Sequence, residues 1–373
     1  MRALITGGAG LIGSHLADLL FKEGYSIRIL DNLEKETHQR KPDWISKEYE
    51  FIKADIRNKK VLEKALGEVD FVFHLAAYGG FTHELTKYIE VNSIGTANIF
   101  EIILRKKLKI KKVIVASSQA IYGEGIYNCS TNGIIEPDLR LLKQLEAGVW
   151  EHHCPKCDKD LVPIATDETK RADPGTIYSI TKFSQECMAI RIGQTLEIPT
   201  VALRFAVTYG PRQSIFNPYT GVISIFSTRI LNGLPPVIYE DGLQTRDFIF
   251  VEDVTRAIYL VSQTNKADYQ IFNVSTGRQT GILGLVDLLN KTYQTDIRTI
   301  LNGEFRPGEV RHLVLDNTKL RRLGWKPKIS LKAGLAKYAE WIKTKGDIKE
   351  YFSKAHETMR KNRVVLQSKR KGK

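Results

Sequence analysis

The sequence predicts an α/β fold in which a doubly wound parallel sheet forms the larger part and a smaller C-terminal α/β part follows. Two observations carry this prediction. Short apolar runs alternate with stretches of helical periodicity, and a glycine-rich turn directly follows the first apolar run. The length of 373 residues allows one large core, or a large domain with a smaller one appended.

The first strand, turn and helix have the order of a dinucleotide-binding unit. An apolar run at 2–5 predicts a buried strand, and residues 14–21 have helical periodicity. Between them stand Gly7, Gly10 and Gly13 at G-x-x-G-x-x-G spacing. Glycines permit a tight turn and let the backbone approach a pyrophosphate, which the helix N-terminus attracts. We therefore expect a Rossmann-type unit that begins at the first residues.

An aspartate ends the second predicted strand, which runs over 26–30. Asp31 lies 18 residues after Gly13, close to the ~20 that separate the glycines from the ribose-binding carboxylate in this kind of unit. A carboxylate there accepts hydrogen bonds from both ribose hydroxyls and repels a 2′-phosphate. This position favours NAD over NADP, and a solvated aspartate at a strand end is the alternative.

Three more apolar runs, at 51–54, 71–77 and 113–116, predict further strands. They end in polar or small residues, including Asp55 and Ser118. In a doubly wound sheet the ligand binds at the carboxyl ends of the strands, so we expect these residues beside the glycine turn. Ser118 also suits the N-cap of a helix or a turn.

Tyr178 and Lys182 stand four residues apart, which places them on one face of a predicted helix. An ammonium near a phenol favours the phenolate, and a tyrosine made acidic in this way exchanges a proton with a sugar hydroxyl near neutral pH. The same spacing occurs by chance on many solvated helix faces. The glycine turn, Asp31 and Ser118 are the context that favours a catalytic site.

Further motifs stand in a fixed order along the chain. They are GGAGLIG at 7–13, DNL at 31–33, HLAA at 74–77, SSQAIYG at 117–123, YSITK at 178–182, LRF at 203–205, YGPR at 209–212, RDFIFVEDV at 246–254, RPGEVR at 306–311 and LGWKP at 323–327. Together they resemble the extended short-chain dehydrogenase/reductase family over residues 1–345. Members with this pattern are nucleotide-sugar epimerases, dehydratases and decarboxylases that hold NAD tightly.

The resemblance implies roles for individual residues. Those in the catalytic places are Ser118, Tyr178 and Lys182. Those in cofactor places are Gly7, Gly10, Leu11, Ile12, Gly13, Asp31, Asn32, Asp55, Ile56, Leu75, Ala76, Ala77 and Asn92, together with Tyr178 and Lys182. Those in substrate places are Ser118, Thr208, Asn217, Arg246 and Arg311.

The implied chemistry is a proton and hydride transfer at one sugar carbon. Tyr178 takes the proton from a hydroxyl while the carbon passes hydride to the nicotinamide. Ser118 holds the same oxygen, and Lys182 lowers the pKa of the tyrosine and contacts the nicotinamide ribose. In a 4-epimerase the 4-keto sugar then turns over and the hydride returns to the other face.

Three observations bear on the substrate and the reaction. The guanidinium groups of Arg246 and Arg311 suit a nucleotide diphosphate. Many relatives have an asparagine where Val207 stands here, and Thr208 beside it is expected to make the missing contact. Dehydratase relatives carry acidic residues directly after the serine, whereas this chain has Gln119 and an alanine. A dehydratase is therefore less favoured, and a decarboxylase stays open.

An insertion at 124–172 separates the serine motif from the tyrosine motif by about twice the usual family gap. It holds three of the chain's four cysteines and two adjacent histidines, which are Cys129, His152, His153, Cys154 and Cys157. The C-x-x-C pair is half of a zinc knuckle. Cys129, with His152 or His153, would complete a tetrahedral structural Zn²⁺ site. Unrelated loop thiols and a redox pair are the alternatives.

Parts of this insertion resemble dTDP-L-rhamnose 4-epimerases. The likeness lies in Cys-Pro-x-Cys followed by Leu-x-Pro-x-x-Thr-x-Glu over 154–168, and in the segment 213–221. It favours 4-epimerisation of a dTDP-6-deoxyhexose such as dTDP-L-rhamnose, with a UDP-sugar 4-epimerase as an alternative. A histidine often follows the first cysteine by three in those proteins, where Asn132 stands here. Cys187, in an apolar helix, is expected in the core.

The predicted domain organisation has three parts. Residues 1–205 form the NAD-binding domain and carry the insertion. Residues 206–345 form the substrate-binding part, interleaved with a returning segment of the first domain at 246–265. Residues 346–373 form a basic extension with a disordered tail. By resemblance, helices over 84–107 and 178–195 make a four-helix homodimer interface.

The net charge of +14 raises one different class of function. The last twenty residues contain eight lysines and arginines against one acid, and such a tail suits nucleic acid or an anionic membrane. A solvated tail is the favoured interpretation. Non-catalytic NAD-sensing or RNA-binding relatives typically lose the tyrosine or the lysine, and both are present here. The four cysteines, with no apolar run of transmembrane length and no predicted signal peptide, suggest a cytoplasmic protein without a membrane span.

Overall fold

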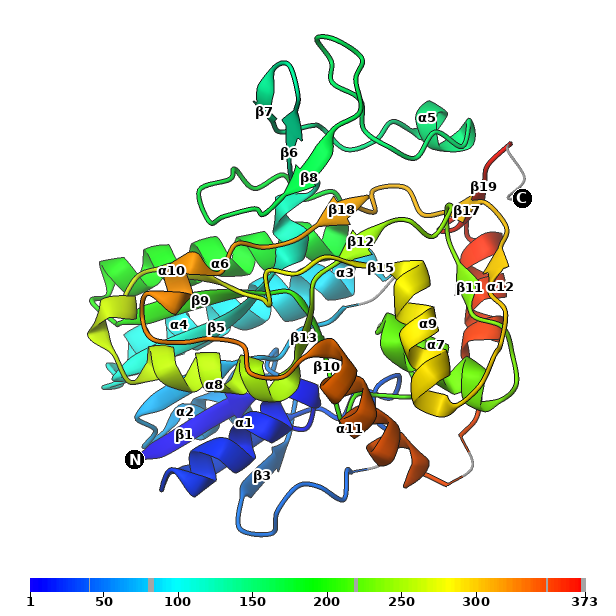
Figure 1. Ribbon diagram of the computed structural model, residues 1–373. Coiled ribbons are helices and arrows are strands. Elements are labelled where there is room, and N and C mark those ends of the chain that lie inside the picture. The colour runs from blue at the N-terminus through cyan, green and yellow to red at the C-terminus, as the bar shows by residue number, and fades with distance from the viewer. Residues whose placement is uncertain (40, 80–83, 218–220, 347, 370–373) are drawn as a thin grey trace.

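The computed structural model describes residues 1–39, 41–79, 84–217, 221–346 and 348–369. Its centre is a seven-stranded parallel sheet in the order β14-β9-β5-β4-β1-β2-β3 (Figure 1). These strands are β14 (Ile271–Val274), β9 (Thr200–Phe205), β5 (Lys112–Ser118), β4 (Phe71–His74), β1 (Arg2–Thr6), β2 (Ser26–Asp31) and β3 (Glu50–Lys53). The predicted doubly wound sheet is confirmed.

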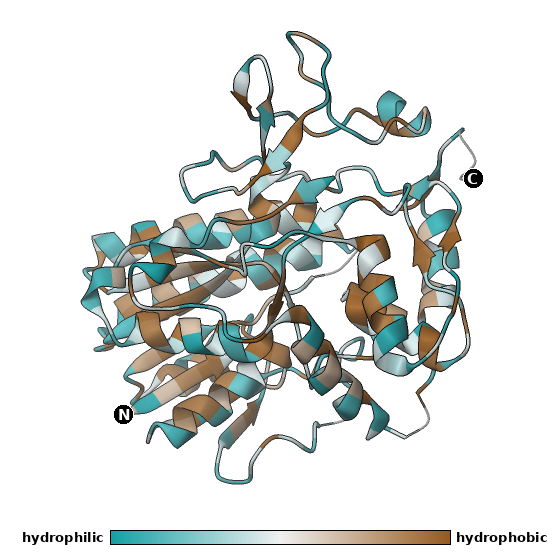
Figure 2. Ribbon diagram, viewed as in Figure 1, coloured by the Kyte–Doolittle hydropathy of each residue, from teal (hydrophilic) through white to brown (hydrophobic). Residues whose placement is uncertain are grey.

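Helices cover both faces of this sheet. Alternate residues of each strand point to opposite faces, so apolar side chains on both faces need a cover. Helices α1 (Leu11–Lys22) and α8 (Val251–Ser262) cover one face. Helices α2 (Lys59–Leu66), α4 (Gly95–Lys106) and α6 (Ile177–Thr195) cover the other. Figure 2 shows hydrophobic residues concentrated on the strands and on the helices around them. The strands are therefore buried on both faces, as a parallel sheet requires.

The second part of the chain forms its own apolar cluster, which includes Phe226, Leu285 and Tyr338. Its helices are α7 (Val222–Leu231), α9 (Ile282–Tyr293) and α11 (Leu331–Lys343). Three small sheets accompany these helices. In two of them β10 (Val207–Tyr209) pairs with β13 (Phe248–Phe250), and β11 (Val237–Ile238) pairs with β16 (Ile300–Leu301). In the third, β12 (Thr245–Arg246) lies between β15 (Thr280–Gly281) and β18 (His312–Leu313). The minor elements are α3 (Leu85–Tyr88), a π-helical turn at Ile89–Ile94, 3-10 turns at Gln119–Tyr122 and Asn265–Ala267, and α10 (Thr318–Arg321).

The return of the chain to the large sheet differs in detail from the prediction. Of the segment expected at 246–265, β13 pairs with β10 outside the large sheet, and α8 packs against α1. The strand that extends the sheet is β14, which pairs with β9. Within the predicted segment, α8 packs on one face of the large sheet, where Val254 and Ile258 belong to the same buried apolar cluster as Ile29 of β2.

The insertion projects from the rest of the molecule and carries a small antiparallel sheet (Figure 1). Its strands are β6 (Ile126–Cys129), β7 (Gly133–Ile135) and β8 (Val162–Ile164), and a short helix α5 (Leu142–Glu146) lies between β7 and β8. Its buried apolar cluster consists of Tyr127, Cys129, Cys154 and Leu161. This cluster is too small to stabilise the insertion without ties to the main body.

The C-terminal extension, described over residues 348–369, packs against the substrate-binding part. Helix α12 (Phe352–Lys361) buries Phe352 and Met359, and β19 (Leu366–Gln367) pairs with β17 (Glu304–Phe305). The last four residues of the predicted disordered tail lie outside the described residues. No described helix is long and apolar enough to span a membrane.

Candidate active site

Two connected cavities lie at the carboxyl ends of the parallel strands. The larger has a volume of about 740 Å³ and the smaller about 280 Å³. Both are bordered by Gly7, Gly10 and Leu75. The position is the one expected for a ligand of a doubly wound sheet.

The three glycines of the turn are needed for different reasons. Gly7 has a φ of +70°, and a Cβ there would lie 2.8 Å from the backbone of Ala76. A Cβ on Gly13 would lie 2.3 Å from the carbonyl oxygen of Gly7. Gly10 is the N-cap residue of α1 and makes no side-chain hydrogen bond to the first N–H groups of the helix. These N–H groups therefore lie beside the cavity without a side-chain partner. This cradle fits a pyrophosphate.

The smaller cavity fits the adenosine half of NAD. Asp31 is held by the backbone, with Oδ2 accepting from the N–H of Ala9 at 3.0 Å and Oδ1 from that of Leu33 at 2.8 Å. The cavity is bordered by the carboxylates of Asp31, Glu34, Glu36 and Asp55 and, among the described residues, by no lysine or arginine. A 2′-phosphate would be repelled, which agrees with the predicted preference for NAD.

Most predicted cofactor residues border these cavities. They are Gly7, Gly10, Leu11, Ile12, Gly13, Asp31, Asn32, Asp55, Ile56, Leu75, Ala76, Ala77 and Tyr178. Lys182 does not, and neither does Asn92. Its buried amide accepts from the N–H of Tyr78 at 2.7 Å and donates to Tyr78 O and Thr181 Oγ1, both at 2.9 Å. Asn92 thus joins the loop beside the cavity to α6.

Tyr178 borders the larger cavity from the first turn of α6. The helix begins there because Thr176 and Ser179 form a reciprocal capping box. Ser118 borders the same cavity at the end of β5, and its hydroxyl caps the following turn by accepting from the N–H of Ala120 at 3.1 Å. The N-cap interpretation and the catalytic interpretation of Ser118 are therefore compatible.

The electrostatics of this pair differ from the prediction for Lys182. Burial raises the pKa of Tyr178, and a hydrogen bond from Ser118 only partly opposes it. The Nζ of Lys182 donates to the carbonyl oxygen of Ala116 at 2.5 Å and to Gln185 Oε1, and burial lowers its pKa to about 7. The Lys182 ammonium thus donates to the backbone of β5 and to Gln185.

The two arginines in predicted substrate places have different surroundings. Arg246 borders the larger cavity, whereas Arg311 does not. The guanidinium of Arg311 is fully buried and pairs with Glu151 of the insertion, with Glu240 at 2.8 Å and with Asp241 at 2.7 Å. The donors of its guanidinium are therefore used by three carboxylates.

Arg306, five residues earlier, borders the larger cavity instead. Its guanidinium lies 4.9 Å from the ring centre of Tyr239 and donates to Glu309. Thr208 and Asn217 border the cavity as predicted, and so does Val207.

Several residues that border the larger cavity were not predicted as site residues from the sequence. Gln119, Gln213, Tyr239 and Gln244 each bring a buried oxygen that has no hydrogen-bond partner within the described part of the chain. Such atoms are costly unless a ligand or water pairs with them. At the far end, the cavity is closed by apolar residues of the C-terminal extension, namely Phe352, Met359 and Val364.

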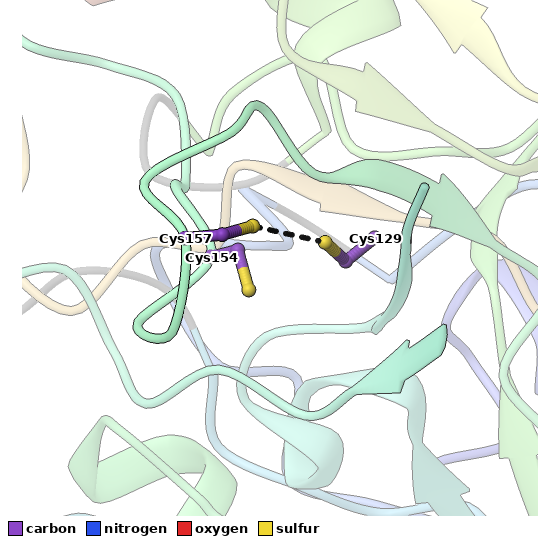
Figure 3. A group of neighbouring side chains, drawn as sticks. All are labelled: Cys129, Cys154 and Cys157. Atoms are coloured by element: carbon purple, nitrogen blue, oxygen red, sulfur yellow. Dashed lines mark hydrogen bonds between the residues drawn. The ribbon is translucent and has the colours of Figure 1, made fainter. Parts of the chain in front are cut away.

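The predicted metal ligands are brought together only in part. The sulfur atoms of Cys129, Cys154 and Cys157 all lie within 4.8 Å of one another (Figure 3). The two histidines are engaged elsewhere: His152 Nε2 lies 3.2 Å from Glu124, and His153 Nδ1 lies 3.1 Å from Asp160. Neither belongs to the cluster.

Cys187 stands apart from that cluster. It is exposed on α6, which corrects the expectation that it is a core residue.

Comparisons with known proteins agree with this site. Residues 3–139 match the NAD dependent epimerase/dehydratase family, and residues 160–338 match the GDP-mannose 4,6 dehydratase family. A dTDP-L-rhamnose 4-epimerase of Burkholderia thailandensis is 30% identical over 91% of this chain and 94% of its own.

Two solved structures have the same fold. The UDP-glucose 4-epimerase of Thermotoga maritima, with UDP-glucose, aligns with a TM-score of 0.78 at 30% identity, over 93% of this chain and 100% of its own. That of Thermus thermophilus, in complex with NAD, aligns with a TM-score of 0.74 at 27% identity, over 92% and 100%. The chain therefore belongs to the NAD-dependent epimerase/dehydratase family of nucleotide-sugar enzymes.

Proposed function

We propose that this protein is a nucleotide-sugar 4-epimerase that acts on a dTDP-6-deoxyhexose such as dTDP-L-rhamnose through a 4-keto intermediate. The observation that carries the proposal is the position of Ser118 and Tyr178. They border one cavity between the glycine cradle and the guanidinium groups of Arg246 and Arg306. The relationship to a dTDP-L-rhamnose 4-epimerase over 91% of the chain supports the choice of sugar.

In this proposal the side chains move one proton and hold one oxygen. Tyr178 accepts the proton of the 4-hydroxyl, and the hydroxyl of Ser118 fixes the same oxygen. NAD, when bound, supplies the hydride acceptor and a cationic ring that favours the phenolate, which offsets the effect of burial on the Tyr178 pKa. Tyr178 returns the proton after the ketone has turned over, and the reaction is redox-neutral because the ketone carbon would also take back the hydride that it gave up.

The remaining cavity residues suit the other parts of the substrate. Arg246 and Arg306 are the proposed partners of the diphosphate, because guanidinium groups bind phosphate oxygens in a fork. Thr208 and Asn217 are the proposed sugar contacts. Lys182 is proposed to contact the nicotinamide ribose by leaving its hydrogen bond to Ala116.

The residues at the far end of the larger cavity bear on which nucleotide base the substrate carries. If the two guanidinium groups hold the diphosphate, the base lies beside Tyr239, where Phe352, Met359 and Val364 provide an apolar wall. Such a wall suits the 5-methyl group of thymine. The second candidate is a UDP-sugar 4-epimerase, which the likeness to the Thermotoga maritima enzyme with UDP-glucose favours.

NMR of incubations with dTDP-L-rhamnose, UDP-glucose and related sugar nucleotides tests both candidates. We expect the C4 epimer of the dTDP-sugar to accumulate. Tyr178→Phe is expected to lower kcat by about 10²–10⁴-fold with NAD still bound. Tyr269→Phe, at the amino end of β14 and away from the cavity, serves as the control. Turnover by the Tyr178 variant within about threefold of the unmodified protein would refute the catalytic assignment.

We further propose that the protein is a cytoplasmic homodimer with the division at 1–205, 206–345 and 346–373 given above. Leu85, Ile89 and Ile180 are 56%, 46% and 49% exposed. They lie on neighbouring helical segments, α3 with its following turn and α6. An apolar patch of this kind suits a second copy of the chain. Free thiols at all four cysteines suit a reducing compartment.

A further inference from the structure

We propose that the insertion binds one Zn²⁺ through the thiolates of Cys129, Cys154 and Cys157, and that the amide oxygen of Asn132 is the fourth ligand. The proposal rests on the arrangement of four side chains from two turns, which Figure 3 shows for the three cysteines. It does not depend on the sugar or on the reaction.

The distances between the sulfur atoms suit a shared metal ion. With a Zn–S bond of about 2.3 Å, tetrahedral geometry separates two sulfurs by about 3.8 Å. The Sγ atoms of Cys129 and Cys157 are 3.5 Å apart, and all three sulfurs lie within 4.8 Å. A disulfide needs about 2.05 Å, so the pair is not bonded. Three sulfurs that converge on one point also differ from a simple redox pair.

Asn132 occupies the fourth corner. Its amide nitrogen lies 3.6, 3.4 and 3.2 Å from the sulfurs of Cys129, Cys154 and Cys157. A tetrahedral oxygen ligand at about 2.0 Å from the zinc stands about 3.5 Å from each sulfur, close to these distances. A half turn about the Cβ–Cγ bond exchanges the amide nitrogen for the oxygen, which then faces the metal.

Two backbone turns hold the ligands in place. Cys129 and Asn132 stand at either side of the β6–β7 hairpin turn, which closes at Gly133 with a φ of +71°. Cys154 and Cys157 stand in a turn that closes through a hydrogen bond from the N–H of Asp158 to Cys154 O at 2.8 Å. The sulfur atoms therefore come from two turns that backbone hydrogen bonds close.

The insertion has a physical need for such a site. Its buried apolar cluster has four residues, two of which are the ligands Cys129 and Cys154. Small units with so little core are commonly stabilised by a metal or a disulfide. A metal bound only in the folded state adds its binding free energy to the stability of the insertion.

The insertion also reaches the larger cavity. Its Arg140 pairs with Glu240 at 2.9 Å and donates to the carbonyl oxygen of Glu309 at 2.8 Å. Both glutamates border that cavity. The metal is thus a positioning element for one wall of the cavity, with no part in the hydride chemistry. We expect its loss to raise KM more than it lowers kcat.

Metal analysis of the full chain, purified without chelators, tests the site. We expect about one equivalent of zinc per chain, and less than about a tenth of an equivalent in Cys157→Ser. Cys187→Ser is the matched control and is expected to keep the full equivalent, because Cys187 lies on α6 away from the cluster. Less than about a tenth of an equivalent in the unmodified protein, or a Cys129–Cys157 disulfide found by mass spectrometry, overturns the proposal.

The fourth ligand is tested by variants that keep the cysteines. Asn132→His creates a three-cysteine, one-histidine set that is common in structural zinc sites. We expect it to slow zinc loss to a chelator by about tenfold or more, and Asn132→Ala to speed it by about tenfold. Cobalt(II) bound in place of zinc is expected to show thiolate charge-transfer absorption in both variants. Equal rates of zinc loss from Asn132→Ala and the unmodified protein refute the role of Asn132.

Discussion

The contact between Glu304 and α12 leads to a sharp prediction about the C-terminal extension. The Glu304 side chain is 4% exposed. It accepts hydrogen bonds from Arg360 of α12 and from Asn302, and lies 2.9 Å from His356 Nε2 of α12. Burial raises the pKa of Glu304, but these partners outweigh it and lower the pKa to about 2. The ionised carboxylate therefore ties α12 to the substrate-binding part.

The size of this tie follows from the pKa shift. The ordinary pKa is 4.5 and the folded value about 2. Since one pKa unit is worth about 1.4 kcal/mol, the ionised group contributes about 3 kcal/mol. A lowered pKa in the folded state means that this contribution is complete above pH 4.5 and is lost as the pH falls through about 2. It is therefore fully present at neutral pH.

Glu304→Gln keeps the shape of the side chain and removes the charge. We expect it to raise the released fraction of α12 by about tenfold or more at neutral pH. Limited trypsin digestion at Lys354, Arg360 and Lys361 measures this release, and a higher KM should accompany it because α12 closes the cavity. Glu357→Gln is the control, since that exposed pair with Lys361 contributes little. Equal cleavage rates in both variants would refute the reasoning.

Three further predictions follow from the cavity and the exposed helices. Gly13→Ala should abolish NAD retention, because the new Cβ would lie 2.3 Å from a backbone oxygen of the same turn. Gly284→Ala, where a Cβ would have no atom within 4 Å, should retain NAD and serves as the control. The NAD released when each purified protein is denatured measures the retention. Arg306→Met should raise KM about tenfold or more without changing the urea midpoint, while Arg311→Met should lower the midpoint by removing a partner of the buried carboxylate of Glu240. Ile180→Glu should produce monomers in sedimentation, and an unchanged dimer would contradict the proposed interface.

The sequence was sufficient where the signal is local. Gly7, Gly10 and Gly13 act through one turn, and Asp31 is fixed by the strand that it ends. The capping box that starts α6 also lies within four residues of Tyr178. These features depend on neighbours along the chain, so their spacing predicts their place in the structure.

Residues whose partners come from distant segments could not be assigned in this way. Arg306 and Arg311 belong to one motif, but only the fold shows that Arg311 meets acids from the insertion and from residues 240–241. The amide of Asn92 is likewise used by Tyr78 and Thr181. Phe352 and Met359 reach the cavity only because the extension folds back on it.

The insertion and the C-terminal extension contact the same wall of the larger cavity. The sequence did not predict the place of either segment in the structure. The insertion contacts this wall through Arg140 and Glu240. The extension reaches it where the ring of His356 lies 5.8 Å from that of Tyr239, the residue just before Glu240. The glycine cradle and Asp31 make no use of either segment in their own hydrogen bonds. Changes in the insertion or the extension should therefore alter which sugar nucleotide binds, while NAD binding and the proposed proton transfer at Tyr178 persist.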